Sequence, residues 1–235
     1  MDDDSILDER GRAPRAVTRY GEHPDQVIEL RGDSAAPPIV VVHGGYWRPE
    51  IDRAHAGPMS DALAEAGFAV ATIEYRRVPG DPDATVDDVR SALTGLKSAL
   101  AGPPVVVGHS AGGHLALLAA ATLRIRAAVA LGPVASLRLA DALHLGDDAA
   151  RAFLGGAAEG RADLDPRELA DPPVPVTIVH GEEDEVVPLA VSAAYLERHR
   201  AARLVQLAGV GHFGVIDPRT PAFARVVDEV RALAG

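Results

Sequence analysis

The chain has 235 residues and no cysteine, and 47% of its residues are hydrophobic against 24% charged. This length suits a single α/β domain with a large core, and the composition excludes disulfides, a cysteine nucleophile and a chain that is disordered throughout. The net charge of −11 leaves no basic cluster to neutralise phosphates, so neither nucleic acid nor an anionic membrane is expected as a partner.

The first residues predict little regular structure. Residues 1–20 are polar, rich in arginine and without periodicity, so we expect an N-terminal arm ahead of one domain that spans residues 1–235. The acidic start from Met1 to Asp4 lacks the basic and apolar regions of a signal peptide. A cytoplasmic location is the corresponding expectation.

Strands and helices alternate in the first half of the chain. Uninterrupted β-branched runs are typical of strands buried on both faces, and apolar residues at helical spacing predict the helices between them. We expect strands at residues 27–31, 39–43 and 68–75, and helices at 59–66 and 83–100. Gly67 follows the first helix as a normal stop signal.

The most informative stretch joins a strand to a helix. Val105–Val107 is a buried apolar run, and Gly-x-Ser-x-Gly follows it at Gly108–Gly112, just before a helix rich in small residues. Such a turn holds a serine on strained backbone so close to its neighbours that the flanking glycines can carry no side chain. This pattern predicts a nucleophile elbow with Ser110 as the nucleophile.

The second half continues the alternation. We expect strands at residues 127–132, 174–180 and 204–207, and helices at 188–199 and 221–234. Residues 133–173 show no strand character and predict a small lid-like insert of short helices, in which His144 and Phe153 either line a pocket or pack. The fold class is therefore α/β, with a mostly parallel sheet, helices on both faces and ligands at the carboxyl ends of the strands.

A glycine-rich loop follows the strand that ends at His43. The loop reads Gly44-Gly45-Tyr46-Trp47, and backbone N–H groups in such a loop can bind a substrate oxygen without a side chain in the way. We assign the oxyanion hole to the N–H groups of Gly45, Tyr46 and Ala111, and substrate binding to Trp47. The alternative is a simple turn with Trp47 packed in the core.

An acid and a histidine follow two late strands. Asp184 and His212 complete the order serine, acid, histidine, in which the acid orients the histidine and the histidine takes the serine proton. Asp184 suits a loop before Val186-Val187-Pro188, whereas its neighbouring glutamates are expected to face water. The alternative for His212 is a histidine in a loop that faces solvent.

Two further groups of residues carry alternatives. Arg76-Arg77 could hold an acidic substrate group, although ion pairs that support the structure are the commoner use of such arginines. A metal centre is the other alternative, because four more histidines lie near these motifs in the sequence. They are His43, His109, His114 and His180. They lack the helical spacing of metal ligands, so we expect no metal and no other cofactor.

In these motifs the sequence resembles the α/β-hydrolase family, and the resemblance extends over nearly its whole length. His43–Trp47 is similar to the His-Gly-Gly-x-Trp oxyanion loop of kynurenine formamidases and related small carboxylesterases, and Gly108–His114 and Glu74–Arg76 are also similar to that group. The resemblance implies hydrolysis of an aryl formamide or a small ester. The spacing of the residues by itself indicates only acyl transfer from serine.

The expected function is therefore a serine hydrolase that forms an acyl-enzyme on Ser110 and acts on a small-molecule ester or amide. A peptidase of the same fold is one alternative, although it would need a larger accessory domain than residues 133–173 provide. A binding protein without catalytic activity is the other, although such proteins lose a triad residue or an oxyanion glycine. A homodimer stays open as the oligomeric state.

Overall fold

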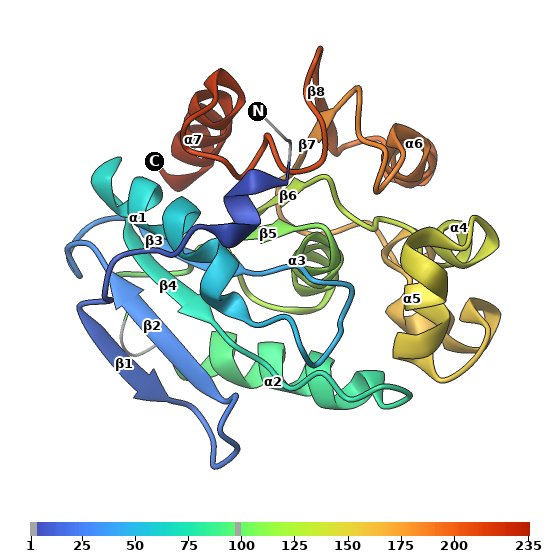
Figure 1. Cartoon of the computed structure of the whole chain (residues 1–235), viewed down its shortest axis with the longest axis horizontal. Helices are drawn as coiled ribbons and strands as arrows, with labels where there is room; N and C mark the ends of the chain where they lie inside the picture. Colours follow the sequence, from blue (N-terminus) through green and yellow to red (C-terminus); the bar gives the residue numbers. More distant parts are fainter. Residues whose placement is uncertain (1–3, 97–99) are drawn as a thin grey trace.

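The structure is a computed structural model that describes residues 4–96 and 100–235, and it contains one eight-stranded sheet (Figure 1). The strands are β1 (Ala16–Arg19), β2 (Val27–Arg31), β3 (Pro38–Val42), β4 (Ala69–Ile73), β5 (Val105–His109), β6 (Ala127–Leu131), β7 (Val176–Gly181) and β8 (Arg203–Leu207). Their order is β1-β2-β4-β3-β5-β6-β7-β8. The first two pairings, β1 with β2 and β2 with β4, are antiparallel and the rest are parallel.

The α-helices connect these strands. They are α1 (Gly57–Glu65), α2 (Pro82–Gly95), α3 (Ala111–Thr122), α4 (Leu137–Ala142), α5 (Leu145–Leu154), α6 (Leu189–Arg198) and α7 (Pro221–Ala234). Local signals set where two of them begin. The side chain of Asp81 accepts a hydrogen bond from Ala84 at the start of α2, and Thr220 caps α7 in the same way. A proline at the first helical position follows each cap, where its missing N–H costs no hydrogen bond.

Side chains of the central strands divide between two hydrophobic clusters. In β3, Ile39 and Val41 lie in the cluster with residues of α1 and α7, and Val40 and Val42 lie in the cluster with residues of α2 and α3. Successive strand residues point to opposite faces, so a strand covered by helices on both faces must be apolar at every position. All of β3 is buried, as its sequence predicts. The mostly parallel sheet with helices on both faces is confirmed.

The N-terminal segment departs from the expected arm. Residues 16–19 form β1, an edge strand paired with β2, and Ile6 is buried at 2% exposure in the cluster with α1 and α7. All residues of β1 are exposed, so the strand has no alternation of buried and exposed residues to reveal it. Met1 to Asp3, on which the cytoplasmic expectation partly rests, lie outside the described residues.

Two other boundaries differ from the expectation. The α2 helix ends at Gly95 rather than at Leu100, and residues 97–99 of the expected helix lie outside the described residues. The region 133–173 contains α4, α5 and two 3₁₀ segments, which stand together at one edge of the molecule in Figure 1. Within residues 4–96 and 100–235, no helix is long and apolar enough to cross a membrane.

Candidate active site

Ser110 lies on the turn between β5 and α3 with φ 55° and ψ −117°. This conformation is strained for a residue with a side chain and persists only where the surrounding structure holds it. A Cβ on Gly108 would overlap the carbonyl of Gly112, and a Cβ on Gly112 would overlap the carbonyls of Val42 and His43. The two glycines are therefore required by backbone crowding, as the nucleophile elbow predicts.

The three residues expected to form a triad follow three parallel strands at the same end of the sheet. Ser110 follows β5, Asp184 follows β7 and His212 follows β8. The Ser110 N–H donates to the carbonyl of Leu131 at 2.9 Å. The residue after Leu131 is Gly132, and a Cβ on it would lie 3.1 Å from Asp184 Oδ2 and 3.3 Å from His212 Nδ1, so it lies next to the other two residues of the expected triad.

Asp184 and His212 form a buried pair. His212 Nδ1 lies 2.7 Å from Asp184 Oδ2, and the two residues are 2% and 7% exposed, respectively. The other carboxylate oxygen of Asp184 accepts the N–H groups of Val186 at 3.0 Å and Val187 at 2.7 Å. Burial by itself would raise the pKa of Asp184, but its hydrogen bonds outweigh burial and hold that pKa well below its usual range. The carboxylate is therefore ionised beside the histidine.

The structure separates Asp184 from its acidic neighbours. Glu182, Glu183 and Glu185 are exposed, as expected, whereas Asp184 points inward. His212 is buried, so the alternative of a solvent-facing loop histidine is wrong. The main-chain carbonyl of His212 also accepts a hydrogen bond from His109 Nε2 at 3.0 Å. The residue before the elbow serine thus supports the histidine loop.

A second histidine, His180, binds the same carboxylate of Asp184, a role that the sequence interpretation did not include. His180 Nε2 lies 3.2 Å from Asp184 Oδ2 and 2.8 Å from the carbonyl oxygen of Val187. Both neighbours are acceptors, so Nε2 carries the hydrogen, and Nδ1 faces the Ser192 hydroxyl at 2.8 Å. The position of this histidine near the end of β7, four residues before Asp184, could have indicated the contact.

The glycine-rich loop lies against the elbow. Gly45, Tyr46 and Trp47 have φ values of 111°, 56° and 55°, and a Cβ on Gly44 would lie 3.2 Å from the Cβ of Ser110. Three successive left-handed residues turn the loop sharply, which brings its backbone beside the serine. Ala111 begins α3, where first-turn N–H groups have no acceptor within the helix. These N–H groups are the expected oxyanion donors.

Buried polar contacts fix the start of this loop. His43 Nε2 lies 3.0 Å from Glu74 Oε1, and the Tyr75 hydroxyl donates to the His43 carbonyl at 2.7 Å while the two rings stack at 4.4 Å. Arg77 and Arg53 pair with the same carboxylate. Burial opposes ionisation of Glu74, but His43 and the arginines lower its pKa far below the usual value. The Glu74–Arg76 segment therefore supports the loop.

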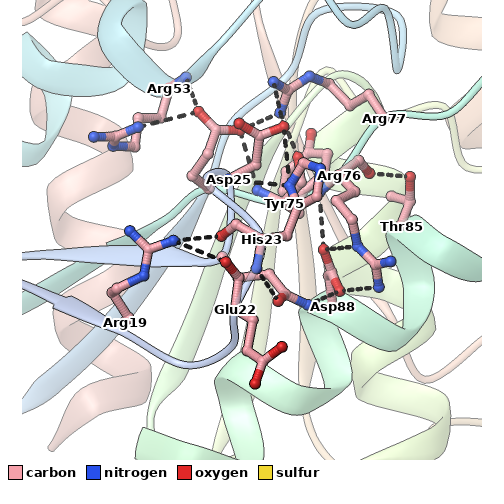
Figure 2. Close-up of polar contacts among 12 residues, drawn as sticks. Arg19, Glu22, His23, Asp25, Arg53, Tyr75, Arg76, Arg77, Thr85 and Asp88 are labelled. Carbon is pink, nitrogen blue, oxygen red and sulfur yellow. Dashed lines mark hydrogen bonds and ion pairs between the residues drawn. The ribbon is translucent and has the colours of Figure 1, made fainter.

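The arginine pair is used in the structure itself. Arg76 binds Asp88 through Nη2 to Oδ1 at 2.7 Å and Nε to Oδ2 at 2.9 Å, and its carbonyl accepts the Thr85 hydroxyl (Figure 2). Arg77 is buried against Glu74. These ion pairs support the second of the two interpretations of Arg76-Arg77, in which the arginines hold the strand end in place.

Trp47 both packs and lines a cavity. Its ring stacks on Phe153 at 4.7 Å and stands perpendicular to His114 at 5.3 Å, and it borders a small apolar cavity beside Ser110. His144 instead lies at the surface, where its Nδ1 is 2.6 Å from Asp148 Oδ1. Phe153 therefore packs behind the site, and His144 takes no part in the cavity.

The four other histidines are held apart by separate protein partners. His43 binds Glu74, and His109 binds the His212 carbonyl. His114 binds the Leu164 carbonyl, and His180 binds the Val187 carbonyl and Asp184. In the part of the chain that the structure describes, no group of three or more histidine, cysteine or acidic side chains is arranged to hold a metal ion.

Sequence and structure comparisons agree with this architecture. The BD-FAE family profile matches residues 27–130, which include the glycine-rich loop and the elbow. Esterase B from Lactobacillus rhamnosis, solved with a tributyrin phosphonate inhibitor, superposes with a TM-score of 0.79 at 22% identity over 99% of this chain and 90% of that one. The chain has the α/β-hydrolase fold. The expected α/β-hydrolase resemblance is thus confirmed.

Other matches are to esterases. Thermogutta terrifontis esterase 2 with propionate superposes with a TM-score of 0.71 at 22% identity, covering 92% of each chain. "Probable carboxylic ester hydrolase LipM" of Mycobacterium tuberculosis is 30% identical over 204 residues, which are 74% of this chain and 46% of the relative. "Esterase LipQ" of the same organism is 27% identical over 71% of this chain and 46% of its own length. The chain spans about half the length of the curated relatives it matches.

Proposed function

We propose that this α/β-hydrolase is a serine hydrolase that cleaves a small carboxylic ester or an aryl formamide through an acyl-enzyme on Ser110. One observation carries the proposal: the strained elbow serine and the buried Asp184–His212 pair lie around Gly132 at the same sheet edge. A serine hydroxyl is a poor nucleophile until a neighbouring base takes its proton, and an oriented imidazole does so near neutral pH.

In this mechanism Ser110 attacks the substrate carbonyl while His212 takes its proton. Asp184 keeps the imidazole in the tautomer that accepts at Nε2 and stabilises the imidazolium, without itself taking the proton. The N–H groups of Gly45, Tyr46 and Ala111 bind the oxyanion, and each such donor is worth about 3 to 4 kcal/mol of transition-state stabilisation. His212 then protonates the leaving alcohol or amine, and water activated by the same histidine releases the acid.

The names of the relatives support the ester side of the proposal. Two curated relatives are named as an ester hydrolase and an esterase, and the solved esterases share the fold over nearly the whole chain. The formamide side rests on the resemblance of His43–Trp47, Gly108–His114 and Glu74–Arg76 to kynurenine formamidases. A location in the cytoplasm stays a prediction.

The decisive measurement compares kcat/KM for N-formylkynurenine with that for p-nitrophenyl acetate and butyrate. A formamide value of about 10⁴ M⁻¹s⁻¹ or more, above the esters, identifies a formamidase, and the reverse identifies a carboxylesterase. Ser110→Ala should lose at least about 10⁴-fold in kcat, whereas the exposed Ser34→Ala should behave as the parent.

Covalent labelling separates the alternatives. A fluorophosphonate should label the parent at Ser110 and leave Ser110→Ala unlabelled. A folded parent that is not labelled and turns over none of the three substrates would contradict the proposal and support a binding protein without catalytic activity. Cleavage of peptides instead of small esters would support the peptidase.

A further inference from the structure

The catalytic residues stand between two hollows of different character. An open, acidic hollow is lined by His212, Phe213, Gly209, Gly211 and the segment Glu182–Val186, together with Asp4. An apolar cavity adjoins it and shares Val186 with it, and this cavity is lined by Ser110 and Ala111 but not by His212. The two sides of the scissile bond therefore meet different surroundings.

The position of the histidine assigns each side. The leaving group must lie next to His212, because this residue gives it a proton. His212 borders the open hollow, so the alcohol or amine leaves on that side. The other substituent of the carbonyl, which is the acyl group, then enters the enclosed cavity beside Ser110 and the oxyanion loop.

This acyl cavity is small and apolar. Besides Ser110 and Ala111, its lining consists of Tyr46, Trp47, Val134, Ala140, Leu145, Ala149, Ala150, Val186 and Val187. The space left between these side chains is about that of one water molecule. A methyl group has a similar size, so an acetyl or formyl group fits, whereas each further methylene must displace a side chain.

Among the lining residues of the insert, Leu145 lies on the least regular backbone. Its flanking residues His144, Gly146 and Asp147 have φ values of 53°, 58° and 55°, a left-handed turn that interrupts the start of α5. Leu145 itself is only half-buried. The other lining residues of the insert are buried, and three of them, Ala140, Ala149 and Ala150, lie within helices.

Contacts with the oxyanion loop hold this turn over the cavity. Arg48 Nη2 donates to the Gly146 carbonyl at 2.7 Å, and the guanidinium carbon of Arg48 lies 4.9 Å from the centre of the Tyr46 ring. A Cβ on Gly146 would overlap the Tyr46 ring, so only glycine allows this close approach. The turn and the oxyanion loop therefore pack as one unit, with Leu145 pointing into the cavity that they enclose.

We infer that Leu145 is a specificity-determining residue that closes the acyl cavity and restricts the acyl group to about one or two carbons. The inference rests on the proposed function, because it assumes attack by Ser110 and a leaving group beside His212. Its physical basis is steric: a longer chain collides with a side chain on the turn that Arg48 and Tyr46 contact through Gly146. Substrates that differ by a methylene in an apolar pocket typically differ by about 10- to 200-fold in kcat/KM.

The test is a chain-length series of p-nitrophenyl acetate, butyrate and hexanoate. The parent should lose at least about tenfold in kcat/KM from acetate to hexanoate, and Leu145→Ala should raise the hexanoate-to-acetate ratio by about tenfold or more. Leu143→Ala is the matched control, because Leu143 is a neighbouring leucine that is 46% exposed and does not line the cavity. Its ratio should equal that of the parent.

A smaller change guards against misfolding. Leu145→Val removes one methylene and should raise the ratio by less than Leu145→Ala does. A parent that hydrolyses hexanoate as well as acetate, or variants at Leu145 with an unchanged ratio, would overturn the inference while fluorophosphonate still labels Ser110. If Ser110 is neither labelled nor needed for turnover, the proposed function fails and this inference fails with it.

Discussion

His180 Nε2 lies 3.2 Å from the Asp184 oxygen that also binds His212 Nδ1 at 2.7 Å. One carboxylate oxygen is thus shared by two imidazoles, and the backbone N–H groups of Val186 and Val187 bind the other. Hydrogen bonds to both carboxylate oxygens therefore fix the orientation of Asp184 toward His212 before substrate binds.

His180→Ala should therefore lower kcat by about tenfold or more, because a hydrogen bond to a charged group contributes roughly 1.5 to 3 kcal/mol. KM for p-nitrophenyl acetate should stay within about twofold, since the interaction of Asp184 with His212 strengthens only in the transition state. Steady-state kinetics on His180→Ala and the parent measure the changes in kcat and KM separately.

His180→Gln tests the same role with less change in volume. The glutamine amide can replace the Nε2 donor, so it should recover part of the lost kcat. A His180→Ala variant that alters KM alone, or that matches its parent in kcat, would show that His180 does not position Asp184. The exposed His23→Ala serves as the control for general effects of histidine removal.

Glu74→Gln should destabilise the fold by about 3 to 5 kcal/mol, because it removes the buried counter-charge of the Arg77 guanidinium and leaves only the half-exposed Asp25 at 4.0 Å. Urea denaturation measures the free energy of unfolding. Glu65→Gln is the control, because the exposed pair of Glu65 with Arg12 should contribute no more than about 1 kcal/mol. Equal effects of the two changes would refute the structural role of Glu74.

Stability should fall between pH 7 and pH 5. Complete burial lowers the pKa of His114 to about 4, and burial together with the nearby His43 lowers that of His55 to about 4. Below the unfolded pKa of about 6.5 the unfolded chain binds protons that the folded chain does not, so each residue costs about 1.4 kcal/mol per pH unit. The folded-state pKa values of Asp184 and Glu74 lie below this window.

His114→Gln should flatten this dependence, because glutamine can still donate to the Leu164 carbonyl but does not titrate. The loss of unfolding free energy from pH 7 to pH 5 should shrink by about 2 kcal/mol relative to the parent. Urea denaturation at both pH values gives the comparison. The same loss in parent and variant would mean that His114 does not resist protonation in the folded state.

Gly112→Ala should destabilise the protein by about 3 kcal/mol or more and abolish turnover, because the new methyl group overlaps two backbone carbonyls of the β3 end that cannot move aside. Gly156→Ala is the matched control, since a Cβ there meets nothing within 4 Å and the residue has no left-handed φ. Thermal unfolding and ester turnover test both. A stable, active Gly112→Ala would contradict the crowded elbow.

Local sequence determined the buried strands, the main helices and the elbow. β3 and the first three residues of β5 are apolar at every position because they are covered on both faces, and Gly108 and Gly112 flank Ser110 because the backbone at the elbow leaves no room for a Cβ. Both signals lie within a few residues along the chain, so they can be recognised without any distant contact.

Only the tertiary structure decided how residues far apart in the chain act together. The second hydrogen bond to Asp184 from His180 and the place of Leu145 over the cavity depend on the packing of loops from different strands. The exposed edge strand β1 also escaped the sequence, because its pairing with β2 is made by backbone groups that side-chain patterns do not report. Patterns in a sequence follow local burial and backbone strain, whereas distances between loops are set by the whole sheet.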